Sequence, residues 1–271
     1  MIVSPLPLAT TAAACVLFAR GFRRLRRRRP EYAGPGRAVL FGLAVAAGLV
    51  AVSAPVDELA DESLAAHMAQ HLLLADVVPL LALLAVRGPL LLFVVPGFLL
   101  RAVAGTRLAD VLGAVTRPLP AFGIWLGALA LWHVPAVYGA ALSRPPLHVV
   151  EHASFVLAGT LAWMQVVDPA HRRALGTIGR LVFLLGMFTA GQMLTMTLVL
   201  VQRPLYEEYA HVTQPLFGMS ALADQDAAGL VMMAEQMLLL GAAAAVLLRR
   251  HLIESDKAAA LEPAPTHPFA G

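Results

Sequence analysis

Long apolar runs constrain the fold of this chain more than any other feature. Mostly apolar stretches of about 18 residues or more recur along the 271 positions, and each is long enough to cross a bilayer as a helix. Hydrophobic residues make up 59% of the sequence and charged residues only 14%, which excludes an ordinary soluble domain. The alternating pattern of a lipid-facing barrel is absent. We therefore predict an all-α, polytopic membrane bundle.

We expect one transmembrane domain, residues 1–252, with seven membrane-spanning helices. The spans are predicted at 3–21, 37–56, 66–86, 119–141, 146–167, 180–201 and 227–248. Two prolines and an arginine interrupt the apolar segment 88–105, so we interpret it as an interfacial or re-entrant piece. The tail 253–271 is rich in Pro and Ala and poor in apolar periodicity, and we predict that it is disordered in the cytoplasm.

The distribution of charge predicts the orientation of the bundle. If the arginine-rich loop between the first two spans is cytoplasmic, all of the 20 basic residues except Arg144 and Arg203 lie inside or in inner loops. The opposite loops are acidic. We therefore expect the N-terminus outside and the C-terminus inside. The arginine run is interpreted as a topological signal, and nucleic acid is not expected as a partner.

Cysteine chemistry is nearly absent from the sequence. The only cysteine, Cys15, lies inside the first predicted span, which excludes an intramolecular disulfide and a C-x-x-C metal motif. We interpret Cys15 as a small apolar packing residue.

Five of the nine histidines fall near the predicted outer ends of three spans: His67, His71, His133, His148 and His152. From the rise of an α-helix, His71, His133 and His152 lie about 8 to 12 Å below those ends, at one level. His67 and His148 each precede a deeper histidine by four residues, so each pair shares one helix face. Ionisable groups at membrane depth are costly and usually functional, which indicates a shared metal site.

Other possible ligands reach the same predicted layer. Met196 and Glu235 are our candidates from the last two spans, near Gln192, Met193, Met232 and Met233. Imidazole with thioether favours copper(I), whereas histidine with a carboxylate alone would suit zinc. Asp76 points about 140° away from His71 on an ideal helix, so we expect it to pair with another helix. Glu151 is either an acceptor that orients an imidazole or an interfacial acid.

Five stretches of the sequence resemble a known family. They are HMAQHLLLADVVPLL (67–81), WHVPAVYGAAL (132–142), LHVVEHASFVLAGTLAW (147–163), RPLYEEYA (203–210) and ADQDAAGLVMM (223–233). In this order and spacing they are similar to the caa3-type cytochrome c oxidase assembly factors of the CtaG family. Two positions depart from the family pattern: Asp226 stands where a second Gln is common, and Met233 stands where a Trp is common.

The resemblance implies a seven-helix bacterial membrane protein that assists oxidase maturation. It places the family's H-M-x-x-H on His67, Met68 and His71, and its H-x-x-E-H on His148, Glu151 and His152. The remaining motifs fall on Trp132, His133, Pro135, Tyr138, Asp224 and Gln225. The implied activity is delivery of copper to an oxidase subunit, with an extracytoplasmic copper donor protein as a possible further partner. No catalysis is expected.

Two alternatives from other functional classes stay open at this point. A zinc-dependent intramembrane hydrolase would use three of the histidines and an acid, although no H-E-x-x-H signature is present. A b-type haem protein would use facing axial histidines, such as His71 with His152.

Overall fold

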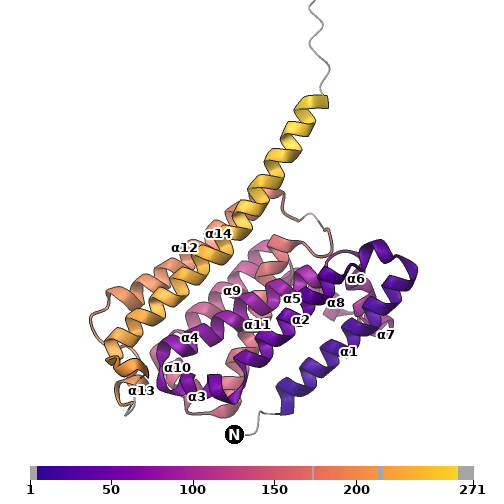
Figure 1. Ribbon diagram of the computed structural model, residues 1–271. Coiled ribbons are helices and arrows are strands. Elements are labelled where there is room, and N and C mark those ends of the chain that lie inside the picture. The colour runs from indigo at the N-terminus through magenta and orange to yellow at the C-terminus, as the bar shows by residue number, and fades with distance from the viewer. Residues whose placement is uncertain (1–4, 173, 213–215, 262–271) are drawn as a thin grey trace, which may run out of the picture.

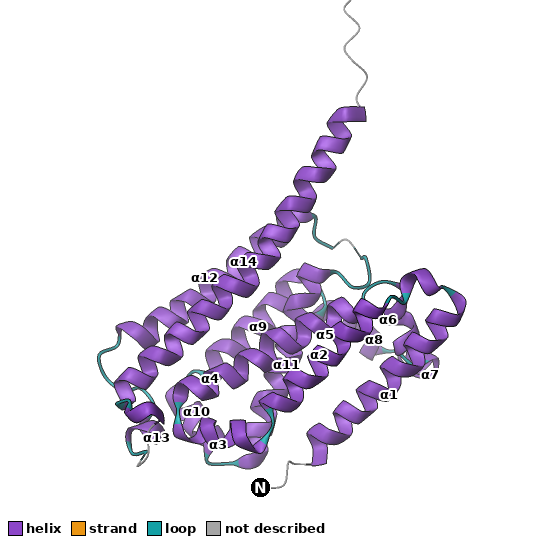
Figure 2. Ribbon diagram, in the orientation of Figure 1, coloured by secondary structure: helices purple, strands orange, loops and turns teal. Residues whose placement is uncertain are grey.

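The protein is described by a computed structural model over residues 5–172, 174–212 and 216–261. Within these ranges every regular element is a helix and there is no strand, which confirms the prediction of an all-helical chain (Figure 2). The α-helices are α1 (Pro5–Arg28), α2 (Pro35–Ala51), α3 (Ala54–Glu62), α4 (Leu64–Leu72), α5 (Val78–Val86), α6 (Pro89–Val94), α7 (Gly97–Val103), α8 (Arg107–Val115), α9 (Pro118–Trp132), α10 (Pro135–Leu142), α11 (Pro145–Val167), α12 (Thr177–Leu200), α13 (Glu207–Ala210) and α14 (Ala221–Leu261). A π-helical turn, η2 (Leu73–Val77), joins α4 to α5, and the 3₁₀ turns are η1 (Pro30–Tyr32) and η3 (Leu216–Gly218).

Four helical segments are long and apolar enough to cross a membrane: Pro30–Ala51, Leu64–Val86, Thr177–Leu200 and Ala221–Lys257. A fifth is possible if α8 and α9, which meet at a bend of 76°, form one broken span. The predicted helix at 146–167 is present as α11. The polar residues His148, Glu151 and His152 lower its mean hydropathy, so α11 is not among the clear candidate spans. The chain is therefore a membrane-type helical protein with four or five clear candidate spans.

Proline sets many of the helix boundaries. It occupies the first turn of α2, α3, α9, α10 and α11, where its missing N–H would lack a partner in any case. Val134, the residue before Pro135, adopts an extended conformation, and α9 ends just before it at Trp132. The single span predicted at 119–141 is therefore wrong in detail, because it is two helices with His133 at the break.

Two further boundaries differ from the prediction. The second helix ends at Ala51 and a separate helix, α3, follows, so the predicted span 37–56 is too long at its end. At the other end of the chain α14 continues to Leu261. The prediction of disorder is therefore wrong for residues 253–261, and residues 262–271 lie outside the described part. In the segment 88–105 the chain forms the short helices α6 and α7 rather than a span.

The helices pack around α11, which contacts α5, η2, α9 and α10. In Figure 1, α12 and α14 lie side by side along one edge of the bundle, and α1 lies at the opposite edge with α6 and α7. The short helices α3, α10 and α13 gather at one end of the bundle (Figure 1). The paired histidines lie near that end, because each pair belongs to the first two turns of its helix, α4 or α11.

The π turn interrupts the long helical segment Leu64–Val86. The Val78 N–H donates to the Leu73 carbonyl, an i→i+5 bond that widens the helix locally. Gly159 of α11 faces this turn so closely that a Cβ atom there would lie 1.7 Å from the Ala75 carbonyl oxygen. Only glycine permits this approach, and it holds α11 against the segment that carries His67 and His71.

Candidate metal centre

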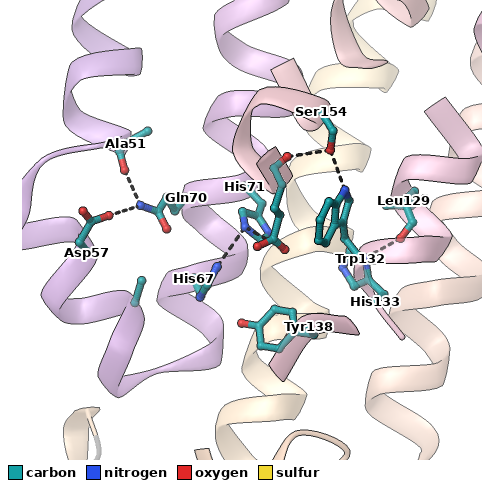
Figure 3. Close-up of polar contacts among 12 residues, drawn as sticks. Ala51, Asp57, His67, Gln70, His71, Leu129, Trp132, His133, Tyr138 and Ser154 are labelled. Carbon is teal, nitrogen blue, oxygen red and sulfur yellow. Dashed lines mark hydrogen bonds and ion pairs between the residues drawn. The ribbon is translucent and has the colours of Figure 1, made fainter. Parts of the chain in front are cut away.

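Four of the five predicted histidines converge on one point. His67 and His71 of α4 and His148 and His152 of α11 each offer a ring nitrogen, and these nitrogens all lie within 4.8 Å of one another. His67 Nε2 is 3.0 Å from His71 Nε2 (Figure 3), and the ring centroids of His148 and His152 are 4.2 Å apart. We call these residues the four-histidine cluster. The i,i+4 spacing seen in the sequence places both rings of each pair on one helix face.

A chain of hydroxyl groups fixes the tautomer of His67. Tyr209 donates its hydroxyl hydrogen to the Ala60 carbonyl, at 2.9 Å, so its oxygen can only accept from its other two neighbours. Those neighbours are His67 Nδ1, at 3.0 Å, and the Tyr138 hydroxyl, at 2.9 Å. His67 therefore carries its hydrogen on Nδ1, and its Nε2 presents a lone pair to the cluster.

Tyr209 is a supporting residue that the sequence reasoning missed. The stretch RPLYEEYA, which carries the family resemblance, contains it, but nothing in the sequence pairs it with His67. Tyr206 of the same stretch donates its hydroxyl to the His133 carbonyl at 3.1 Å. Burial raises the pKa of both tyrosine hydroxyls, which therefore stay protonated and act as hydrogen-bond donors.

Glu151 is buried beside the cluster, next to His71, rather than at an interface. Glu151 stands between the two histidines of α11 in the sequence, and its side chain is fully buried. One of its carboxylate oxygens is 3.7 Å from His71 Nε2. Among the described residues, neither oxygen has a hydrogen-bond partner. A buried carboxylate without a donor is costly, and a bound cation is one way to satisfy it.

The first turn of α4 is held by an acid from the far end of the sequence. Asp224, in the first turn of α14, accepts hydrogen bonds from Ser63 Oγ at 2.7 Å and from the Leu64 and Ala65 amides at 2.6 and 3.2 Å. Its negative charge lies at the positive end of α4. The neighbouring Gln225 donates to the Leu198 carbonyl at 2.9 Å and accepts from the Leu205 amide at 2.7 Å. The D-Q pair thus ties α14 to α4 and to the end of α12.

The acidic helix α3 lies over the same end of the bundle. Gln70 of α4 donates to the Ala51 carbonyl and to Asp57, both at 2.6 Å, which joins α2, α3 and α4 (Figure 3). Burial and the neighbouring acids, chiefly Asp57, raise the pKa of Asp61. The raised pKa reflects a concentration of negative charge close to His148, which favours the approach of cations.

The other predicted ligands lie outside the cluster. His133 is buried at the end of α9, and its Nδ1 donates to the Leu129 carbonyl at 2.7 Å (Figure 3). His133 and Glu235 line a cavity beside His71, whereas Met196 is on the exposed surface of α12. Asp76 accepts a hydrogen bond from Trp163 Nε1 of α11 at 2.8 Å, which confirms the expectation that it pairs with another helix. It also lines the same cavity as His71, because the π turn brings residues five apart onto one side.

The four-histidine cluster fits a metal ion. Two imidazoles on one tetrahedral ion at about 2.0 Å have their nitrogens roughly 3.3 Å apart, so ring nitrogens within 4.8 Å need only small movements. Among the described residues, the buried Nε2 atoms of His148 and His152 have no partner, so each can bind an ion when its hydrogen is on Nδ1. The donor set suits copper or zinc rather than magnesium or calcium.

Neither alternative from the sequence analysis is supported by this geometry. The His71 and His152 ring centroids are 5.3 Å apart, which leaves no room for a macrocycle between them. A hydrolytic zinc site keeps one position open for water, whereas four imidazoles converge here.

Comparison with known proteins gives one match. The family model described as cytochrome c oxidase caa3 assembly factor (Caa3_CtaG) matches residues 16–253, which include the whole four-histidine cluster. No curated protein and no solved structure matches this chain.

Proposed function

Because the chain belongs to the cytochrome c oxidase caa3 assembly factor family, we propose that it binds copper(I) at the four-histidine cluster and delivers it to an oxidase subunit in the bacterial plasma membrane. The observation that carries the copper step is the convergence of four imidazoles beside the buried Glu151. His67 has its lone pair on Nε2 because Tyr209 holds the hydrogen on the other nitrogen, and His148 and His152 have an unpartnered Nε2 within the described part of the chain.

The unequal burial of the two histidine pairs gives the proposed direction of transfer. His67 and His71 are 0% and 4% exposed, whereas His148 and His152 are only partly buried. His67 therefore cannot serve as an outer capture ligand, and entry falls to His148. Copper(I) accepts low coordination numbers, so two or three imidazoles can hold it while the others exchange. Release to a partner then needs no catalytic step.

We further propose a seven-span topology with the N-terminus outside. Besides the clear candidate spans, α1 and α11 have 24 and 23 residues, enough to cross about 30 Å of hydrocarbon. Arg26, Arg27 and Arg28 end α1, and the acidic α3 lies at the opposite end of the bundle, in agreement with the positive-inside rule. This orientation places the histidine end of the bundle toward an extracytoplasmic copper donor protein.

Metal content and oxidase activity test the copper step together. The His148→Ala/His152→Ala variant should lose copper from the cluster and fail to mature the oxidase, while remaining inserted in the membrane. His211→Ala is the matched control, since His211 is exposed and belongs to no cluster. Copper is measured by mass spectrometry of purified protein, and oxidase activity is measured in cells that carry each variant.

Two results would overturn the copper step. One is normal copper content and oxidase activity in the double variant. The other is zinc as the bound metal in wild-type protein from copper-supplemented cells.

A further inference from the structure

A second group of metal-type side chains lies beside the four-histidine cluster. A cavity of about 40 Å³ is located where two apolar core regions meet, one containing Trp125 and Met187 and the other containing Met68 and Met232. Protein interiors normally close such seams with apolar side chains. Here the apolar lining is interrupted by three thioethers, two imidazoles and two carboxyl groups, and the cavity has room for an ion or a few water molecules.

His133 presents a free lone pair to this cavity. Its Nδ1 lies 2.7 Å from the Leu129 carbonyl, which can only accept, so the hydrogen is on Nδ1 and Nε2 is bare. The residue is 9% exposed, and Nε2 has no partner in the described ranges. A histidine that donates one nitrogen to a backbone carbonyl and leaves the other bare is oriented as metal-binding histidines are.

Three of the ten methionines surround the same space. Met68, Met187 and Met232 come from α4, α12 and α14, and each is at most 3% exposed. Thioether sulfur with imidazole is the donor set that copper(I) prefers, and the four-histidine cluster contains no sulfur.

The carboxyl groups of the cavity supply negative charge. Among the described residues, neither oxygen of Glu235 has a hydrogen-bond partner, and Asp76 accepts one hydrogen bond, from Trp163 Nε1 at 2.8 Å. A cation in a low-dielectric interior needs such a counter-charge.

His71 connects the cavity to the cluster. Its Nε2 lies 3.0 Å from His67 in the cluster, and its ring also lines the cavity, where its Nδ1 has no partner in the described part of the chain. Because η2 is a π turn, Asp76, five residues after His71, also lies on the cavity side of the helix. His71 therefore belongs both to the four-histidine cluster and to the lining of the cavity.

We propose that this cavity is a second copper(I) site, formed by His133 with the thioethers of Met68, Met187 and Met232, which receives the ion from the four-histidine cluster through His71. The proposal rests on the proposed copper function and adds a second holding position deeper in the bundle. Asp76 and Glu235 balance the charge of the ion there. Transfer changes the donors from imidazole nitrogen alone to nitrogen and sulfur.

X-ray absorption of the copper-loaded full-length protein distinguishes the two sites, because only the cavity offers sulfur. Wild-type protein loaded with copper(I) should bind two ions per chain and show copper–sulfur scattering. The Met68→Leu/Met187→Leu/Met232→Leu variant, which nearly conserves volume, should bind one ion with nitrogen scattering only. The His148→Ala/His152→Ala variant should bind no more than one ion, and the copper that it binds should show sulfur scattering. Met193→Leu/Met196→Leu, on the exposed face of α12, is the matched control and should behave as wild type.

If the triple methionine variant does not fold, His133→Ala replaces it and should likewise reduce the bound copper from two ions to one. One wild-type ion with nitrogen scattering alone overturns the cavity site and leaves the proposed function standing. Sulfur scattering that persists in the triple variant also overturns it. Binding of no copper by wild-type protein is the failure of the proposed function itself.

Discussion

Two helix pairs in this bundle are held together in different ways. The pair α12 and α14 runs along one edge of the bundle over most of the length of α12 (Figure 1). Its polar contacts include a hydrogen bond from Gln192 Nε2 to Gln236 Oε1 at 3.2 Å and, near the end of α12, one from Gln225 Nε2 to the Leu198 carbonyl at 2.9 Å. The pair of α11 with the segment α4, η2 and α5 carries instead a backbone contact at Gly159, the π turn, Glu151 and four histidines.

The difference shows where specific geometry is concentrated in this protein. In the contact between α12 and α14, a Cβ added at Gly191 would first meet the side chain of Gln236, which can rotate away. The contact between α11 and the π turn joins backbone to backbone and sets the distance between the two histidine pairs. A small displacement there separates the ligands.

The largest effect is expected from adding one methyl group to that contact. In Gly159→Ala the new Cβ would meet the Ala75 carbonyl oxygen at 1.7 Å, and neither backbone can move without shifting a helix. We expect a loss of about 3 kcal/mol or more in stability, together with loss of copper binding. Thermal unfolding in detergent measures the stability.

Two matched substitutions test the cause of that loss. Gly123→Ala makes the same chemical change where nothing lies within 4 Å, and it should be neutral. Gly191→Ala between α12 and α14 meets only the side chain of Gln236, which can rotate, and it should cost less. Equal losses in all three variants would remove the distinction between the two helix pairs.

The next largest effect concerns the tautomer of His67. In Tyr209→Phe the acceptor for His67 Nδ1 is lost, so Nε2 is no longer held as a lone pair. We expect copper affinity to fall about 10- to 100-fold, the usual cost of losing such a supporting hydrogen bond. Tyr138→Phe, which removes a donor to Tyr209 but not the acceptor for His67, is the control and should have a smaller effect. Competition with a copper(I) chelator measures both affinities, and unchanged affinity in Tyr209→Phe would contradict the assigned tautomer.

A smaller loss is expected at the first turn of α4. Asp224→Ala removes the acceptor for Ser63 Oγ and for the Leu64 and Ala65 amides. Loss of a helix cap and its charge costs about 1 to 2 kcal/mol. Asp226→Asn, on the same turn of α14, is the control, since Asp226 Oδ1 has no partner among the described residues. Chemical denaturation measures the stability of both variants. Equal stability of Asp224→Ala and Asp226→Asn would show that the cap is not needed.

Much of the bundle follows from hydropathy, because lipid-facing helices must be apolar along their length. That argument finds α11, α12 and the first part of α14, although the histidines and the acid of the site reduce the hydropathy of α11. It misses the break at His133 and the helical continuation to Leu261, which depend on a single proline and on polar helix propensity.

From the sequence, the candidate site could be predicted only within single helices, where the spacing of residues shows which of them share a face. The i,i+4 pairs in α4 and α11 fix two histidines each, and the structure brings these four together. His133 and Glu235, which were expected in the same layer as the other ligands, lie in the adjoining cavity, and Met196 faces outward. Asp76 pairs with another helix as expected, through Trp163, but its place in the cavity depends on the π turn, which the geometry of an ideal helix does not include.

The smallest effect is expected from the polar contact between α12 and α14. Gln192→Leu removes a hydrogen bond of 3.2 Å between helices that share a long apolar contact. Hydrogen bonds between transmembrane helices contribute about 0.6 kcal/mol on average, so we expect a loss of that size and unchanged copper content. The same denaturation assay used for Asp224→Ala provides the measurement. A loss as large as that of Asp224→Ala would mean that α12 and α14 also depend on a specific polar contact, and the contrast between the two helix pairs would then fail.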